Sequence, residues 1–84
     1  MNRKELISDL KNIVTPYVQD KKVLENINEQ NDFIKDLKIN SANLIDIILD
    51  VEQKYDIEID NESMEKMLTI GAAIDIITAK LNKK

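Results

Sequence analysis

The fold of this chain is decided by residues 40–55, which read NSANLIDIILDVEQKY. The stretch after Asn40 contains no glycine or proline, and asparagine is a favourable N-cap residue. At about 100° per residue, one set of its apolar side chains falls within an arc of roughly 100°, wide enough to pack against a core. That set is Leu44, Ile47, Ile48, Val51 and Tyr55. The stretch therefore predicts an amphipathic helix over residues 41–55.

The same helix carries a second apolar strip. Ala42, Ile45 and Leu49 cluster roughly 100–160° away from the centre of the first stripe. Polar and acidic residues lie beside this strip: Asp46, Asp50, Glu52 and Gln53. Two interpretations are open, because either another protein or the long loop before the helix could cover the strip. The helical spacing favours neither one.

A first helix is predicted near the N-terminus. Asn2 and Glu5 have the spacing of a capping box, and apolar residues then recur every three or four positions. Pro16 lacks a backbone N–H and crowds the preceding turn, so it should end or kink this helix. The apolar stripe consists of Leu6, Leu10, Ile13, Val14 and Tyr17.

Residues 20–39 show no sustained period and are predicted to form a long loop. A loop of this length is uncommon unless it has a function. It carries apolar residues that favour packing over the core: Val23, Leu24, Ile27, Phe33, Ile34 and Leu37.

The C-terminal third predicts a short helix and a longer one. Residues 56–60 form a connecting loop, and Asn61 is expected to cap a short helix through Met67. Thr69 is expected to cap a final helix whose stripe holds Ile70, Ala73, Ile74, Ile77 and Leu81. The predicted fold is all-α, a four-helix bundle in one domain over residues 1–84, with three main helices, a short third helix and a long first loop.

Composition excludes several functions. The chain has no cysteine and no histidine, so thiolate metal sites and Ser-His or Cys-His nucleophilic pairs are absent. A domain of 84 residues also has little interior in which to shift the pKa of a carboxylate or lysine. We therefore expect no enzymatic activity and no metal site. The acidic run from Asp56 to Asp60 does not match an EF-hand, because the required glycine and glutamate positions hold Asn61 and Met67.

Charge and hydropathy suggest where the protein acts. The net charge of −4 argues against a nucleic-acid partner, which would select a clustered basic face. No apolar run approaches the roughly 20 residues of a membrane span, and the first ten residues lack the apolar stretch of a signal peptide. We expect a cytoplasmic monomer that does not insert into membranes.

Ser41 is unremarkable by itself, since a serine at a helix start commonly contributes to capping. No residue type in this chain is suited to activate its hydroxyl as a nucleophile. Any chemistry at Ser41 must therefore be performed by another protein.

The sequence resembles the acyl carrier proteins. Residues 36–42, Asp-Leu-Lys-Ile-Asn-Ser-Ala, are similar to the family's Asp-Leu-Gly-x-Asp-Ser-Leu, and the following helix ends in a similar acidic and aromatic pattern. Residues 57–67 and 69–77 resemble the family's third-helix and final-helix regions, and Phe33 occupies its aromatic loop position. The resemblance runs from about residue 31 to residue 78, and the order of the motifs is more specific than any one of them.

The resemblance implies a four-helix bundle whose Ser41 receives 4′-phosphopantetheine from coenzyme A through a separate, magnesium-dependent phosphopantetheinyl transferase. Acyl intermediates are then carried as thioesters between acyl-loading, condensing and modifying enzymes. In the family the second helix recognises these partners. The implied partner-binding residues are Asn40, Ala42, Ile45, Asp46, Leu49, Asp50 and Gln53.

Three residues depart from the family pattern. Asn40 replaces an aspartate that helps the transferase hold its metal, and Ala42 replaces a larger apolar contact. Gln53 makes the partner-binding side less acidic, which should alter association rates and partner choice. These departures favour a dedicated secondary pathway or a divergent lineage over housekeeping fatty-acid synthesis.

Alternatives remain open on the sequence. Fatty-acid or polyketide-type cargo is favoured over an aminoacyl or peptidyl group, because a peptidyl carrier usually has Gly-Gly where this chain has Lys38 and Ile39. An interaction module whose Ser41 is never modified is the alternative from a different class.

Overall fold

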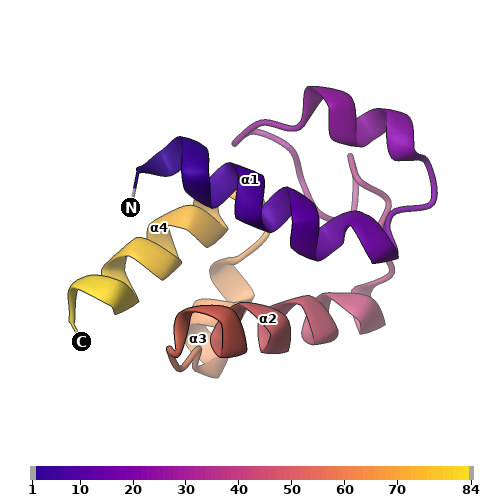
Figure 1. Ribbon diagram of the computed structural model, residues 1–84. Helices are drawn as coiled ribbons and strands as arrows, with labels where there is room; N and C mark the ends of the chain where they lie inside the picture. Colours follow the sequence, from indigo (N-terminus) through magenta and orange to yellow (C-terminus); the bar gives the residue numbers. More distant parts are fainter. Residues whose placement is uncertain (1, 84) are drawn as a thin grey trace.

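The computed structural model describes residues 2–83 and shows a small helical bundle (Figure 1). In chain order the elements are α1 (Arg3–Val14), the 3₁₀ helices η1 (Thr15–Tyr17) and η2 (Lys21–Asn26), α2 (Ser41–Tyr55), α3 (Asn61–Lys66) and α4 (Ile70–Asn82). Extended pairing within this range is limited to an isolated antiparallel bridge between Asp32 and Thr69. The all-α prediction is confirmed, and α2 spans the residues expected from its sequence.

Side-chain caps fix where the helices begin. The side-chain oxygen of Asn2 accepts from the N–H of Glu5 at 2.8 Å, and the Thr69 hydroxyl accepts from the N–H of Ala72 at 3.1 Å. The expected cap of α3 was wrong by one residue. Asp60 is extended and its carboxylate accepts from the N–H of Ser63 at 2.7 Å, so Asn61 is already helical.

Pro16 ends α1 as expected, and the chain tightens instead of kinking. The α-helix stops at Val14, and Pro16 lies within η1, whose first turn needs no proline N–H. The ammonium of Lys21 donates to the carbonyl oxygens of Thr15 and Val18. These bonds tie Lys21 to the turn that follows α1.

The segment 20–39 is more ordered than the sequence predicted. It contains η2, which the sequence did not reveal because a short 3₁₀ turn has no extended apolar period. The loop does pack on the core, through buried Leu24, Phe33 and Leu37. Ile34 is an exception, since 41% of its surface remains exposed.

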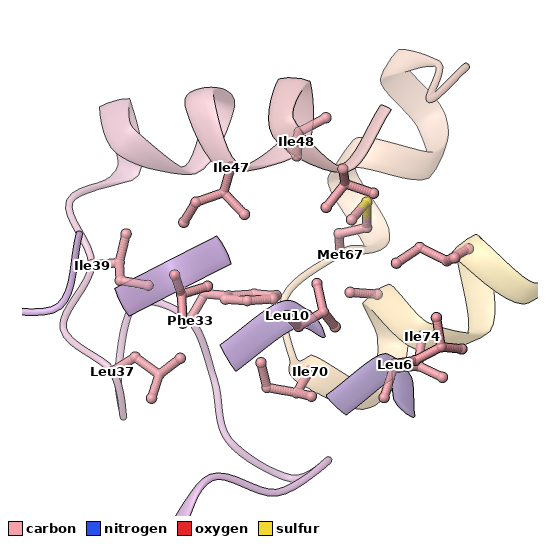
Figure 2. Close-up of a cluster of buried hydrophobic side chains, with 14 of the residues drawn as sticks. Leu6, Leu10, Phe33, Leu37, Ile39, Ile47, Ile48, Met67, Ile70 and Ile74 are labelled. Carbon is pink, nitrogen blue, oxygen red and sulfur yellow. The ribbon is translucent and has the colours of Figure 1, made fainter. Parts of the chain in front are cut away.

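The core lies between α1, α2, α4 and the loop that precedes α2 (Figure 2). From α2 it takes the predicted stripe, except that Leu44 is only partly buried. The described residues bury no polar or charged side chain. The buried set comprises Leu6, Leu10, Val14, Val18, Leu24, Phe33, Leu37, Ile39, Ile47, Ile48, Val51, Tyr55, Ile59, Met67, Ile70, Ala73, Ile74 and Ile77.

The loop is also tied to the start of α4. The N–H of Gly71 donates to the carbonyl of Glu29 at 2.9 Å, and a Cβ at position 71 would lie 3.0 Å from that oxygen. A larger residue here would require the loop to shift by a few tenths of an ångström. Arg3 forms ion pairs with Glu29 and, at 2.9 Å, with Asp75. These contacts hold the loop that leads to α2.

Candidate functional site

Ser41 is the first residue of α2, and its side chain is exposed. The preceding residue, Asn40, is extended, and its side-chain oxygen accepts from the N–H of Ala42 at 2.9 Å. Its backbone carbonyl accepts from the N–H of Asn43 at 2.9 Å. Asn40 thus serves as the N-cap that the sequence predicted, and its side chain is already engaged by the helix.

The turn before Ser41 is anchored by side chains that are buried in the core. Leu37 and Ile39 are both buried, and the N–H of Ile39 donates to the carbonyl of Phe33 at 3.0 Å. Between them, the exposed Lys38 has a φ of 56°, a left-handed conformation that favours glycine. The family pattern has glycine at this position. Lys38 is therefore a fourth departure from the family pattern. The motif quoted above shows the substitution, but only the structure shows that the backbone at this position has a positive φ.

Asp32 stabilises the beginning of this turn. Its carboxylate accepts from the N–H groups of Lys35 and Ile34, at 2.9 and 2.8 Å. These backbone bonds hold the pKa of Asp32 below its ordinary value. The carboxylate of Asp36 in turn accepts from the N–H of Asp32 at 2.7 Å. The approach to Ser41 is thus fixed by short local bonds and by two buried side chains.

The second apolar strip of α2 is on the surface. Ile45 and Leu49 are 53% and 48% exposed, and Ala42 is also exposed. The loop does not cover this strip, because its buried side chains enter the core instead. The interpretation in which the loop covers it is therefore wrong. Together with Asp46, Asp50 and Gln53, these residues form one side of α2 that we call the partner face.

The carboxylates of the partner face differ in their surroundings. Asp46 and Gln53 are exposed, whereas Asp50 is half-buried. The hydroxyl of Tyr17, which ends η1, donates to the carboxylate of Asp50 at 3.3 Å. The sequence placed Tyr17 only in the stripe of the first helix, and nothing in its spacing indicated this contact.

The ionisation of Tyr17 reflects this environment. Burial raises the pKa of the Tyr17 phenol above its ordinary value, and the negative charges of Asp50 and Asp46 add to that effect. The phenol therefore lies within electrostatic reach of both carboxylates.

A surface groove of about 520 Å³ lies elsewhere, between the end of α2, the loop that follows it and the end of α4. Its lining includes Glu52, Asp60 and Lys80. Because α2 rises about 1.5 Å per residue, this groove is about 20 Å along the helix from Ser41. It does not form part of the same site.

Ser41 presents a hydroxyl group at the surface of the protein. Within residues 2–83 no three acidic residues are placed to hold a metal ion, and the chain has no histidine. None of the helices in this range combines the length and apolar character needed to cross a lipid bilayer. The geometry offers an anchored, exposed hydroxyl beside an exposed apolar and acidic helix face.

Comparison with known proteins gives a consistent result. No family model matches the chain. It is 32% identical to an acyl carrier protein of Coprothermobacter proteolyticus over the full length of both chains. It is 36% identical to an acyl carrier protein of Buchnera aphidicola, over 96% of this chain and 90% of that one.

Solved structures agree with these relatives. A crystal structure of acyl carrier protein from Thermotoga maritima superposes with a TM-score of 0.82 at 31% identity, covering 99% of this chain and 94% of the other. Acyl carrier protein from Enterococcus faecalis gives a TM-score of 0.76 at 26% identity, covering 95% and 99%.

The fold and the site together define a small helical carrier domain with an exposed serine at the start of its second main helix. The chain belongs to the acyl carrier protein family. Members of this family carry a covalently attached 4′-phosphopantetheine group and interact with biosynthetic enzymes.

Proposed function

We propose that Ser41 is the attachment point of 4′-phosphopantetheine and that the protein carries acyl intermediates on this group. The observation that carries the proposal is the location of Ser41. It is an exposed hydroxyl at the first residue of α2, held by the Asn40 cap and by buried Leu37 and Ile39. An enzyme can reach such a hydroxyl without unfolding the bundle.

The surroundings of Ser41 suit a phosphate ester. The first turn of a helix carries a partial positive charge, which favours an anion. Two exposed residues of the preceding turn, Lys38 and Asn40, are not acidic, so neither would repel a phosphate. When bound, the group supplies a terminal thiol that holds acyl groups as thioesters.

The partner face is the surface by which we expect enzymes to recognise the carrier. Its exposed apolar residues suit a hydrophobic contact, and its two aspartates suit a rim of basic residues. The proposed contact residues are Asn40, Ala42, Ile45, Asp46, Leu49, Asp50 and Gln53. The partners would be a phosphopantetheinyl transferase followed by acyl-loading, condensing and modifying enzymes.

The proposed pathway class is fatty-acid or polyketide-type biosynthesis in the cytoplasm, with residues 1–84 acting as a single monomeric carrier domain. The altered residues at Asn40, Ala42 and Gln53 support a dedicated pathway or a divergent lineage. Lys38 and Ile39, in place of Gly-Gly, argue against an aminoacyl or peptidyl cargo.

Intact mass spectrometry tests the attachment. The purified protein is incubated with coenzyme A, Mg²⁺ and each of several broad-specificity phosphopantetheinyl transferases. We expect one added phosphopantetheine mass on the wild type and none on a Ser41→Ala variant. Ser8→Ala is the matched control, because Ser8 is an exposed helical serine away from the site, and this variant should be loaded normally.

The alternative is an interaction module that is never modified. Wild-type protein that stays unmodified with every transferase, while remaining folded by circular dichroism, would support that alternative and overturn the proposal. Loading of the Ser41→Ala variant would show that another serine is the acceptor.

A further inference from the structure

Tyr17 joins the end of α1 to the partner face of α2. The residue is half-buried in η1, and its hydroxyl donates to the half-buried carboxylate of Asp50. Asp46 lies one helical turn before Asp50 on α2 and is exposed. A side chain that comes from outside α2 therefore contacts one of the two acidic groups that a partner would meet.

The spacing of the two aspartates gives this contact a physical role. Carboxylates at positions i and i+4 of a helix repel one another. A phenol hydroxyl that donates to Asp50 restricts the rotation of this side chain and partly offsets the repulsion between the two carboxylates. The raised pKa of Tyr17 indicates that the phenol remains a neutral donor at physiological pH. The distance of 3.3 Å is longer than the usual O–H···O contact, so its effect on overall stability is small.

We propose that Tyr17 is a positioning residue of the partner face, which holds the Asp50 carboxylate in place for a basic side chain of the partner enzyme. The inference rests on the proposed function of this face. The Tyr17 hydroxyl occupies one oxygen of Asp50, and the other oxygen is left to accept from a partner's lysine or arginine. A carboxylate fixed before binding loses less conformational entropy when the complex forms.

The two aspartates then have different roles. Asp46 is exposed, so it contributes mainly to long-range attraction, which salt screens. Asp50 is held by Tyr17 and contributes to the formed complex. The partner that fits this arrangement is a protein surface with an apolar centre and at least one cation placed over the Tyr17 side of α2.

The molecule provides a matched control in a second tyrosine–aspartate pair. The hydroxyl of Tyr55, in α2, donates to the carboxylate of Asp9, in α1, at 2.8 Å. Tyr55 is buried and does not belong to the partner face. Removing its hydroxyl should affect stability without affecting recognition.

Steady-state loading kinetics test the proposal, with a broad-specificity phosphopantetheinyl transferase as the probe partner. The carrier concentration is varied for the wild type, Tyr17→Phe, Asp50→Asn, their double variant, Asp46→Asn and Tyr55→Phe. Tyr17→Phe should raise KM about two- to fivefold with kcat unchanged, the scale of one long hydrogen bond. The double variant should match Asp50→Asn alone, because Tyr17 acts through Asp50.

The controls separate positioning from stability. Asp46→Asn should reduce the dependence of KM on salt. Tyr55→Phe should lower Tm and leave KM unchanged.

Each remaining outcome decides the question. The inference would be overturned if Tyr17→Phe left KM unchanged. It would also be overturned if the effects of Tyr17→Phe and Asp50→Asn on KM multiplied in the double variant. Either outcome would leave the proposed function standing. An equal rise in KM for Tyr55→Phe would also overturn it, because the effect would then follow stability. A wild type that no transferase loads would overturn the proposed function and the inference together.

Discussion

The two apolar faces of α2 have similar side chains and opposite environments. Ile48 is 1% exposed, whereas Ile45, three residues earlier on the same helix, is 53% exposed. The buried face packs on the core with α1 and α4, whereas Ile45 and Leu49 on the other face remain exposed. Burial is therefore decided by what lies opposite a residue, since the hydrophobicity of these isoleucines is the same.

This difference explains how a small protein can both fold and bind. The face that packs against α1 and α4 supplies the free energy of folding through buried apolar area. The exposed strip costs little in solution because it is narrow and bordered by carboxylates. Its apolar area can instead be buried when a partner binds. One helix thus supplies both the core and the proposed partner face.

The largest expected effect comes from replacing an isoleucine by alanine on the buried face of α2, compared with the same replacement on the exposed face. Ile48→Ala leaves a cavity in the core and should lower the free energy of unfolding by about 2–4 kcal/mol. Ile45→Ala should change it by less than about 0.5 kcal/mol, while raising KM for transferase loading. Urea denaturation followed by circular dichroism measures the first quantity, and the loading assay measures the second.

The pair also provides its own control, because both variants delete the same group from one helix. If Ile45→Ala destabilised the protein as much as Ile48→Ala, the strip would be covered in solution. The comparison of the two faces would then fail.

The sequence predicted the faces of α2 but not what covers them. The stripe from Ile47 to Tyr55 and the strip at Ile45 and Leu49 both followed from helical spacing, which is a local property. Whether the loop or solvent meets the strip depends on contacts between distant segments. Ile34 illustrates this limit, since it was grouped with Phe33 among the apolar residues of the loop and yet 41% of its surface remains exposed.

Two further differences, in η2 and at the start of α3, have local causes. The 3₁₀ helix η2 was missed because six residues are too few to show a period. The cap of α3 was placed on Asn61 instead of Asp60 because both residue types are good caps. At the candidate site, the positions of Asn40 and Ser41 were predicted, whereas the bond from Tyr17 to Asp50 joins residues 33 positions apart. No local pattern could have indicated that bond.

A second comparison, with an effect of intermediate size, concerns the two tyrosine–aspartate pairs, which join α2 to α1 through Tyr55 and to η1 through Tyr17. Tyr55→Phe removes a 2.8 Å bond from a buried hydroxyl to a carboxylate and should lower the free energy of unfolding by about 1–2 kcal/mol. Tyr17→Phe removes a longer bond at a half-buried position and should lower it by less. Thermal unfolding of both variants at neutral pH checks this order, and the reverse order would show that the partner side bears more of the bundle's stability.

The contribution of the two tyrosines to stability should also depend on pH. Burial, together with the bond to Asp9, raises the pKa of Tyr55 above its ordinary value, and burial raises that of Tyr17. A phenol that binds its proton more tightly when folded stabilises the protein fully below the unfolded pKa of about 10. This contribution is lost as the pH rises through the folded value. The wild type should therefore lose stability above about pH 10, and Tyr55→Phe should lose less of it over the same range.

The smallest expected effect tests the two ends of α2, which orient both faces. Lys38, before the helix, and Asp56, its C-cap, have positive φ values of 56° and 52°. Glycine adopts this conformation without strain, so Lys38→Gly should stabilise the protein by about 0.5–1 kcal/mol. Asp56→Gly should give a smaller gain, because aspartate tolerates left-handed backbone better than lysine does.

Lys38→Ala separates backbone strain from charge in this prediction. It removes the ammonium group and keeps a Cβ at the same φ, so its free energy of unfolding should stay near that of the wild type. If Lys38→Ala stabilised the protein as much as Lys38→Gly, charge would be the cause, and the turn before Ser41 would carry no strain. The expected result would show that Lys38 is strained at a position where the family pattern has glycine. This conformational strain would then lie immediately before α2, next to the candidate attachment site Ser41.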